Sequence, residues 1–234
     1  MRLKAIEAIV KRGALLVYPL NNKREPLSLW YELFPRSKMR WEWDETADDR
    51  VADLWSVREQ LSRSRKVVYS KWYQGRATLF SPELLIHLLA HLESHKVRHV
   101  LSQQSQNVIE LLEADSPLST KQLKAAADLE GRMMEPTYNR AMKPLWNNLL
   151  AVGFGEFQDS SFPSLGIGAT STLFEELWDK AGKIPQAEGE AYLLKVWGDQ
   201  NPFWKYAKRV RKQWSDLVLE NNDDRYISDK SEEN

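Results

Sequence analysis

The four histidines of the chain are the residues whose type and spacing first point to chemistry. His87, His91, His95 and His99 lie four residues apart, and the sequence has no other histidine. Four residues of helix turn the chain by about 400°, so neighbouring imidazoles share a face and a pair of them can chelate a metal ion. Zinc needs three or four protein ligands, and a third imidazole one turn further along cannot reach the same ion.

We therefore predict no metal site and no cofactor, and interpret the histidines as the polar edge of a helix whose apolar side faces the core. A metal completed by carboxylates is one alternative. The other is a proton switch, since histidine titrates near a pH of about 6.5.

A second set of candidate residues lies on a helix expected around Tyr138 to Leu149. At helical spacing its apolar residues face inward, and four polar residues face outward: Asn139, Arg140, Lys143 and Asn147. Asparagine and arginine read adenine and guanine edges through paired hydrogen bonds. We predict that these four residues contact nucleic acid, with a solvated face as the alternative. Pro144 is expected to kink this helix.

Basic residues form two further groups. Lys71 and Arg76 lie on a predicted hairpin, and a C-terminal segment interleaves five basic residues with tryptophan and tyrosine. These five are Lys205, Lys208, Arg209, Arg211 and Lys212. Basic and aromatic side chains together are typical of a helix that contacts phosphates. We expect both groups to line one positive groove; the alternative is that each is an ordinary solvated face.

Local signals define the elements that must position these residues. In RSRKVVYSKWYQGRATLFS, apolar and polar residues alternate on both sides of Gln74-Gly75, which predicts a two-stranded hairpin. Ser81-Pro82 supplies an N-cap and a proline at the first helical position, so the helix that carries the histidines is expected to begin there. An opening helix from Leu3 to Lys11 and a buried strand in ALLVYPL precede the hairpin.

Downstream of Gln106 the pattern changes to short helices followed by a glycine-rich segment. Ser119 and Gln122 are spaced as a capping box for a second helix, which must lie across the first because only three residues separate them. A third helix and the glycine-rich segment follow, in the order of a winged helix-turn-helix. We predict that the third helix is the recognition helix and that the glycine-rich segment is the wing.

Composition limits the class of protein. Basic and acidic residues number 33 each among 234 residues, so net charge alone does not indicate a nucleic-acid-coating protein. The absence of cysteine excludes disulfides, thiolate catalysis and cysteine-bound zinc. No stretch approaches the roughly 18 apolar residues of a membrane span. We expect a cytoplasmic protein that does not associate with membranes.

We predict a helix-rich α+β fold, in which a winged helix-turn-helix lies between an N-terminal mixed α/β region and C-terminal helices. The mixed region, with the basic hairpin and the histidine-bearing helix, is expected at 1–104 and the winged-helix domain at 105–182. The C-terminal helices are expected at 183–220. The polar, acidic tail at 221–234 is predicted to be disordered.

Three segments of the predicted winged helix carry a resemblance to a known family. The order PLSTKQLKAAADL, YNRAMKPLWNNLLAVGFGEF, wing, TLFEELWDK resembles the winged-helix module of the AlkZ-type crosslink-repair DNA glycosylases and of their shorter relatives, the AlkZ-related proteins. The upstream segment LWSVREQLSRSRKVVYSKWYQGRATLFSPELL is also similar to those shorter relatives. The resemblance covers roughly residues 10 to 182 and implies DNA as the partner, with a link to DNA repair.

The same resemblance implies where catalytic residues should lie. AlkZ-type glycosylases carry a glutamine-apolar-glutamine or glutamine-apolar-aspartate motif near the N-terminus, which places the water that attacks the glycosidic carbon. No glutamine of this chain lies in such a motif, and Gln158-Asp159 lacks the intervening residue. We therefore predict a DNA-binding protein and assign no catalytic residue. The alternatives are a glycosylase that uses other residues, and a winged helix that serves as a protein-interaction surface.

Overall fold

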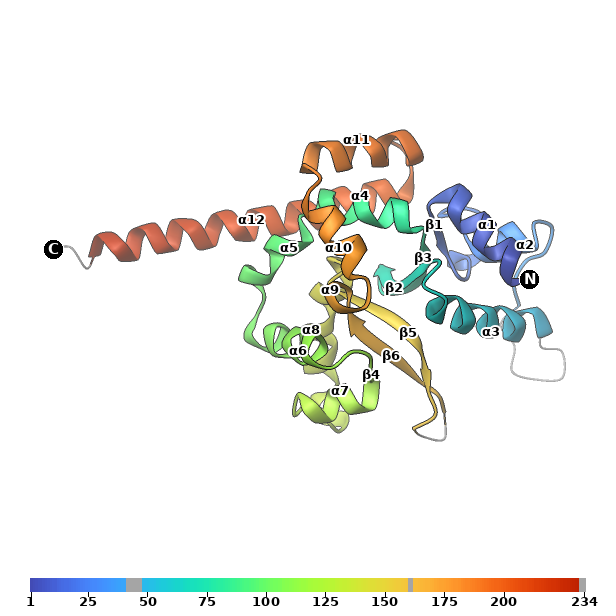
Figure 1. Cartoon of the computed structure of the whole chain (residues 1–234), viewed down its shortest axis with the longest axis horizontal. Helices are drawn as coiled ribbons and strands as arrows, with labels where there is room; N and C mark the ends of the chain where they lie inside the picture. Colours follow the sequence, from blue (N-terminus) through green and yellow to red (C-terminus); the bar gives the residue numbers. More distant parts are fainter. Residues whose placement is uncertain (41–47, 160–161, 232–234) are drawn as a thin grey trace.

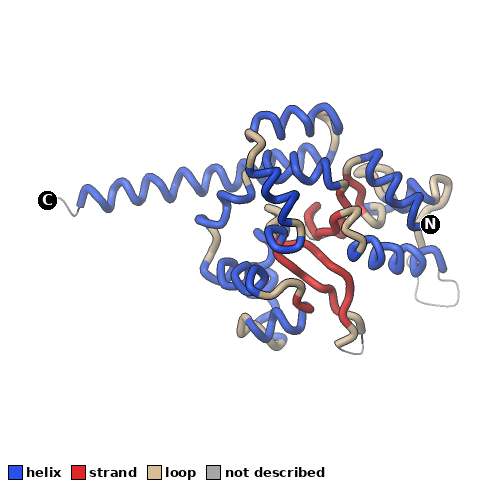
Figure 2. The backbone as a smooth tube through the Cα atoms, viewed as in Figure 1, coloured by secondary structure: helices blue, strands red, loops and turns tan. Residues whose placement is uncertain are grey.

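The computed structural model describes the backbone of residues 1–40, 48–159 and 162–231, and side chains within these ranges as far as residue 216. The described residues form a helix-rich α+β fold around a six-stranded sheet with the strand order β1-β3-β2-β5-β6-β4. All neighbouring strands of this sheet pair antiparallel. Figure 2 shows the strands at the centre of the molecule with helices around them. The prediction of a helix-rich α+β protein is thus confirmed.

The N-terminal helices cover one end of the sheet (Figure 1). They are α1 (Arg2–Arg12), α2 (Leu29–Leu33) and α3 (Asp49–Arg63), with β1 (Ala14–Leu16) and the short η1 (Leu20–Asn22) between them. Ile9, Trp30 and Leu61 are fully buried where these helices pack on Leu15 and Leu79 of the sheet. Gly13 ends α1 with a φ of 78°, a left-handed value that favours glycine.

The predicted hairpin is present as β2 (Val68–Tyr73) and β3 (Arg76–Phe80). Gln74 and Gly75 both have positive φ, as a two-residue hairpin turn requires. Helix α4 (Pro82–Leu92) begins as predicted, because the Ser81 hydroxyl accepts a hydrogen bond from the backbone N–H of Leu84.

The expectation that one helix carries all four histidines is wrong. Helix α4 ends at Leu92, and Glu93 has a left-handed φ of 50°. His95 therefore lies in α5 (Ser94–Val97) and His99 in η2 (Arg98–Val100). Only His87 and His91 share a helix.

In the central part of the chain, helices and a short strand are followed by a β-hairpin. It comprises α6 (Gln103–Ala114), β4 (Leu118–Ser119), α7 (Thr120–Ala126), η3 (Arg132–Met134), α8 (Glu135–Asn147), β5 (Ala151–Phe157) and β6 (Ser164–Ala169). The capping box of Ser119 and Gln122 is formed. Helix α8 continues through Pro144 without a break.

The C-terminal part comprises α9 (Thr170–Leu173), α10 (Glu175–Gly182), α11 (Gln186–Trp197) and α12 (Pro202–Ser231). Helices α10 and α11 pack against α4, and α12 extends away from the body of the molecule toward the C-terminus (Figure 1). The backbone at 221–231 is helical, which differs from the predicted disordered tail. After Pro202 the sequence has no glycine or proline that would end a helix.

The sheet is continuous across the boundary expected near residue 104. Tyr69 of β2 pairs with Gly153 of β5, and the Ser70 hydroxyl donates a hydrogen bond of 3.2 Å to the carbonyl oxygen of Ala151. The expected N-terminal region and winged-helix domain therefore share one sheet. None of the described helices is long and apolar enough to cross a membrane.

Candidate functional site

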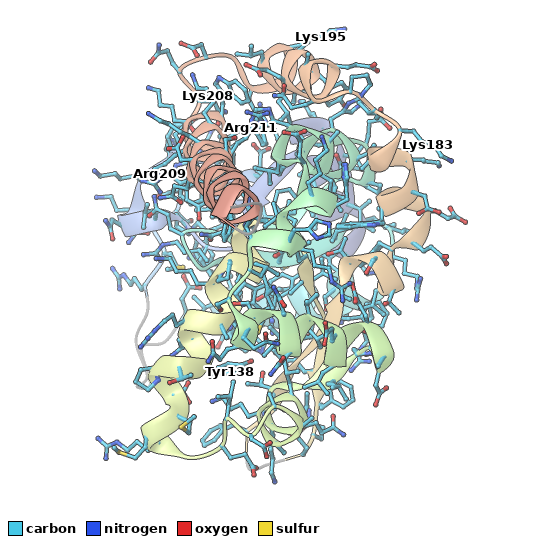
Figure 3. The ribbon with its side chains drawn as sticks, turned by 90° about the vertical axis from the view of Figure 1, so that its left-hand side faces the viewer. Tyr138, Lys183, Lys195, Lys208, Arg209 and Arg211 are labelled. Atoms are coloured by element: carbon cyan, nitrogen blue, oxygen red, sulfur yellow. The ribbon has the colours of Figure 1, made fainter. Side chains whose placement is uncertain are left out.

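A groove lies where the β2–β3 turn, α7, α8 and α12 meet. Its volume is about 740 Å³, within the range of roughly 300–1,000 Å³ typical of ligand sites. We call it the α8–α12 groove. Its lining residues are Lys71, Gln74, Gly75, Thr120, Lys124, Glu135, Tyr138, Asn139, Met142, Lys143, Trp146, Asn147, Ile167, Tyr206, Arg209, Val210 and Gln213. Figure 3 labels Tyr138 of α8 and Arg209 of α12.

Helix α8 supplies the largest wall of the groove. Asn139 and Lys143 are exposed along it, whereas Tyr138, Met142 and Trp146 are buried against the core. Asn139 and Lys143 thus lie on the predicted outward face, whereas Asn147, which was also predicted to face outward, is half-buried. Exposed amide and ammonium groups thus follow one another along a wall that is backed by aromatic side chains.

The opposite wall is the first part of α12. The Tyr206 hydroxyl donates a hydrogen bond of 3.0 Å to Oδ1 of Asn147, which joins α12 to the end of α8. The guanidinium of Arg209 lies over the Tyr206 ring, 5.0 Å from its centroid. This contact holds the Arg209 side chain beside the groove while its charge remains exposed.

The charge of the groove is strongly one-sided. Among the side chains that the structure describes, its lining includes four basic residues, Lys71, Lys124, Lys143 and Arg209, and one acidic residue, Glu135. Glu135 forms an ion pair with Lys124. The other three cations are therefore available to a ligand that carries negative charge.

Lys71 differs from the other basic residues of the groove because it is half-buried. It has no hydrogen bond or ion pair with any residue that the structure describes. Burial lowers the pKa of its ammonium group, and the nearby charge of Arg58 lowers it further. From the sequence, Lys71 is predicted only to contact phosphate. Its burial could not be predicted, because it depends on the fold.

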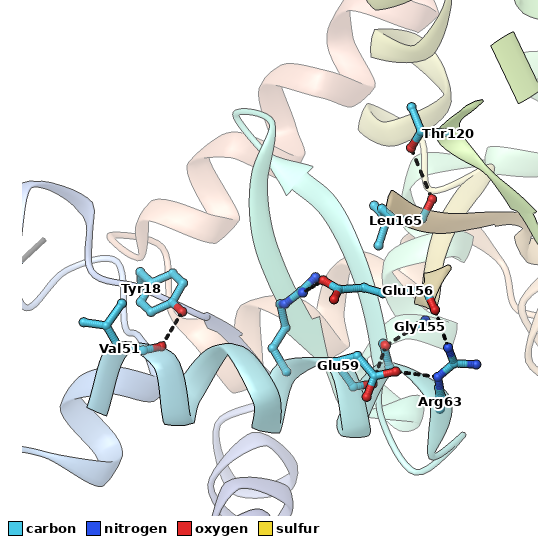
Figure 4. Close-up of polar contacts among 10 residues, drawn as sticks. Tyr18, Val51, Glu59, Arg63, Thr120, Gly155, Glu156 and Leu165 are labelled. Carbon is cyan, nitrogen blue, oxygen red and sulfur yellow. Dashed lines mark hydrogen bonds and ion pairs between the residues drawn. The ribbon is translucent and has the colours of Figure 1, made fainter. Parts of the chain in front are cut away.

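A buried ion pair between Arg58 of α3 and Glu156 of β5 connects the N-terminal helices to the β5–β6 hairpin (Figure 4). Both side chains are buried, and the Arg58 guanidinium lies 4.2 Å from the Trp55 ring centroid. Nearby, Arg63 donates a hydrogen bond of 2.6 Å to the carbonyl oxygen of Glu156 and also pairs with Glu59.

Helix α7 is attached to the sheet by a further hydrogen bond, which Figure 4 also shows. The Thr120 hydroxyl donates to the carbonyl oxygen of Leu165 at 3.2 Å.

The structure brings five of the predicted nucleic-acid contacts together in the groove. They are Lys71, Asn139, Lys143, Asn147 and Arg209. Arg76 and Arg140 are exposed but do not line it. Reasoning from sequence missed Lys124, whose place in the groove follows from its ion pair with Glu135 and its contact with the Tyr138 ring, both on α8.

The basic cluster of α12 is divided between different faces of the helix. Lys208 pairs with Asp199 at 3.0 Å, Lys205 donates to Gln200, and Lys212 is exposed outside the groove. Arg211 donates to the carbonyl of His91 at 2.9 Å and pairs with Glu93. The residues of α12 that line the groove are 206, 209, 210 and 213, and their spacing places them on one face of the helix. The five basic residues of the cluster therefore do not line the groove together.

Two of the histidines belong to the packing of α4 against α11. His87 stacks on Tyr192 with ring centroids 3.8 Å apart, and Nδ1 of His91 lies 3.1 Å from Nε2 of Gln186. Burial lowers the pKa of His91 to about 4. Among the described residues, no three histidine, aspartate or glutamate side chains are placed to share a metal ion.

Comparison with known proteins identifies the family. A solved structure of the Streptomyces sahachiroi DNA glycosylase AlkZ is similar, with 13% sequence identity and a TM-score of 0.48. The match covers 83% of this chain and 50% of that one, so the chain spans about half the length of the structure that it matches. No curated protein matches the sequence. The family model described as "AlkZ related" matches residues 3–192, which is most of the chain, and the protein therefore belongs to the AlkZ-related family.

Proposed function

We propose that this protein binds DNA and that the α8–α12 groove forms part of the contact surface. The observation that carries the proposal is the combination of three available cations, Lys71, Lys143 and Arg209, with the side-chain amides of Asn139 and Asn147 in one groove. Cations supply most of the affinity for the phosphate backbone, and amides can read base edges. Membership of the AlkZ-related family is consistent with a role in DNA repair.

We further propose that α6, α7, α8 and the β5–β6 hairpin form a winged helix, with α8 as the recognition helix. In support, β4 lies between the first two of these helices and pairs antiparallel with β6. Helix α6 also packs against α8. In this motif the recognition helix enters the major groove, and the exposed face of α8 carries Asn139, Arg140 and Lys143.

The test is the salt dependence of binding, measured by fluorescence anisotropy with a labelled DNA duplex. The logarithm of affinity should fall with the logarithm of salt concentration, with a slope of about −0.9 for each phosphate contact. The double variant Lys143→Ala/Arg209→Ala should bind more weakly, and its slope should be less steep by up to about 2.

The matched control is Lys183→Ala/Lys195→Ala, which also removes two positive charges. Both lysines are exposed, Lys183 directly after α10 and Lys195 in α11, and both lie away from Arg209 and Tyr138 (Figure 3). This control should bind with the affinity and slope of the unchanged protein. Equal losses in the two double variants, or no binding at low salt, would contradict the proposal.

We also propose that the protein does not excise bases at the rates of the glycosylases it resembles. A group that positions or activates water contributes about 10²- to 10⁴-fold, and the motif expected to provide it is absent from this sequence. A single-turnover assay with excess protein on a duplex with a methylated purine should yield no more abasic product than the protein-free control. Abasic product above that level would favour catalysis by other residues.

A further inference from the structure

The side-chain amine of Lys71 has surroundings that no other described lysine has. It comes from the central strand β2, it is half-buried, and it lines the α8–α12 groove without a hydrogen bond or ion pair to a described residue. By contrast, Lys124 in the same groove is paired with Glu135, and Lys143 is exposed. Binding of phosphate alone would favour an exposed, fully charged lysine.

The groups around Lys71 limit what can react with it. Lys143 and Arg209 supply positive charge for phosphates, while Tyr138, Trp146 and Tyr206 supply aromatic surface. A lysine amine in a desolvated site beside another cation is an activated nucleophile toward carbonyl groups. The groove therefore favours a reactant that carries both phosphates and a carbonyl group.

We propose that Lys71 forms an imine with the aldehyde carbon of an abasic deoxyribose in DNA bound at the α8–α12 groove. The Nζ lone pair attacks C1′ of the ring-opened sugar, and the two hydrogens of the amine leave with the carbonyl oxygen as one molecule of water. Hydrolysis of the C=N bond reverses the step, so no oxidant, reductant or cofactor is consumed. The substrate must be supplied by a reaction that cleaves the glycosidic bond of a nucleotide in DNA.

The protonation state of Lys71 supports this chemistry. Only the neutral amine has a lone pair to donate, and burial together with the charge of Arg58 lowers the pKa of Lys71. At a given pH near neutrality, a larger fraction of Lys71 is therefore neutral than of an ordinary exposed lysine.

The first test is borohydride trapping, and its DNA substrate rests on the proposed function. A labelled duplex with one abasic site is mixed with the protein, and borohydride reduces any C=N bond to a stable C–N bond. We expect a covalent complex with the unchanged protein and with Lys195→Arg, and loss of this complex with Lys71→Arg. The arginine variant keeps the positive charge, and anisotropy sets the protein concentrations at which it and the unchanged protein occupy the abasic duplex equally before borohydride is added.

Two outcomes overturn the inference: trapping by Lys71→Arg at the level of the unchanged protein, and no trapping by the unchanged protein on an abasic duplex that anisotropy shows to be bound. Failure to bind any duplex at low salt is a different result. It overturns the proposed function and the abasic substrate with it.

A second test needs neither DNA nor a variant of Lys71. Pyridoxal 5′-phosphate combines an aldehyde, an aromatic ring and a phosphate, which are the three features that the groove would accept. After brief exposure at neutral pH, reduction and peptide mapping, Lys71 should be labelled before the exposed Lys183 and Lys195. Labelling of these exposed lysines with Lys71 spared would overturn the nucleophilic role of Lys71.

Discussion

Identical side chains in this protein have different chemistry because of where they lie. His91 of α4 is buried where α11 and α12 pack against that helix, whereas His95, four residues further along the sequence, is exposed. Burial lowers the pKa of His91 from its ordinary value of 6.5 to about 4, and the nearby Glu190 only partly opposes this effect. His91 is therefore neutral in the folded protein at physiological pH.

The first prediction follows from this pKa. As pH falls below about 6.5, the unfolded chain takes up a proton at His91 before the folded protein does, so stability falls until the pH reaches about 4. Between pH 7 and 5 this effect should cost about 2 kcal/mol of unfolding free energy. Urea denaturation of His91→Leu should show a pH dependence reduced by this amount, whereas His95→Gln should keep it. An unchanged pH dependence in His91→Leu would contradict the assignment.

The buried ion pair of Arg58 and Glu156 provides the second prediction. Replacing Glu156 by glutamine leaves the Arg58 charge buried without its counter-ion, which should cost about 3 kcal/mol or more of unfolding free energy. The matched control is Glu59→Gln, because Glu59 pairs with the more exposed Arg63. Its cost should be below about 1 kcal/mol. If the two variants lose the same free energy of unfolding in urea denaturation, the buried pair contributes no more to stability than the exposed pair, and the prediction is wrong.

At the scale of elements, α11 packs closely against α4. A Cβ atom on Gly189 of α11 would lie 2.7 Å from the backbone oxygen of His87 and 2.9 Å from the backbone nitrogen of His91. Backbone atoms cannot move aside as a flexible side chain can. Gly189 therefore sets how closely α11 approaches the histidine-bearing helix.

The third prediction is that Gly189→Ala destabilises the protein by roughly 1–3 kcal/mol, because it forces α4 and α11 apart. Helix propensity alone predicts a gain of about 1 kcal/mol. Gly182→Ala, in α10, is the control, since nothing lies within 4 Å of its added Cβ. Thermal denaturation should show a lower midpoint for the first variant only. A higher midpoint for both variants would mean that α4 and α11 can move apart without loss of stability.

The elements that could be predicted are those whose signals are local. The turn at Gln74-Gly75 and the caps at Ser81 and Ser119 depend on residues within a few positions, and all three are present. The end of α4 could not be predicted in this way. Glu93 adopts its left-handed conformation where it pairs with Arg211, which is 118 residues away in the sequence.

The candidate site was predictable to a similar extent. The helical spacing of Asn139 and Lys143 was enough to predict that they share one face of α8, and their residue types were enough to predict a contact with nucleic acid. The division of the α12 cluster could not, because it depends on which face of α12 packs against α8 and α4. The burial of Lys71 depends on the pairing of distant strands and on the position of Arg58.

At the scale of the whole molecule, the shared sheet links the two halves of the chain. Leu149 and Val152 pack in the same buried cluster as Val68 and Trp72, and Gly155 donates its N–H to the Ser62 hydroxyl at 2.9 Å. Separating the halves would expose this cluster and break the β2–β5 pairing. The two halves should therefore stabilise each other.

The fourth prediction is that the chain unfolds in a single transition. Tryptophan fluorescence and far-UV circular dichroism should give the same urea midpoint and slope, as expected for cooperative unfolding. Tyr69→Ala, which removes the side chain that covers Gly153, should lower both midpoints together. Two separated transitions would instead support independent domains on either side of residue 104.

The strands at the two ends of the sheet also limit how molecules can associate. At one end, β4 has two residues and follows Pro117, which has no N–H to donate. At the other end, the outer side of β1 is covered because Leu16 donates its N–H to the carbonyl of Leu27. Aggregation by strand addition requires a row of free N–H and C=O groups along an edge. Neither end of this sheet offers such a row, so its central strands are protected from adding to the sheet of a second molecule.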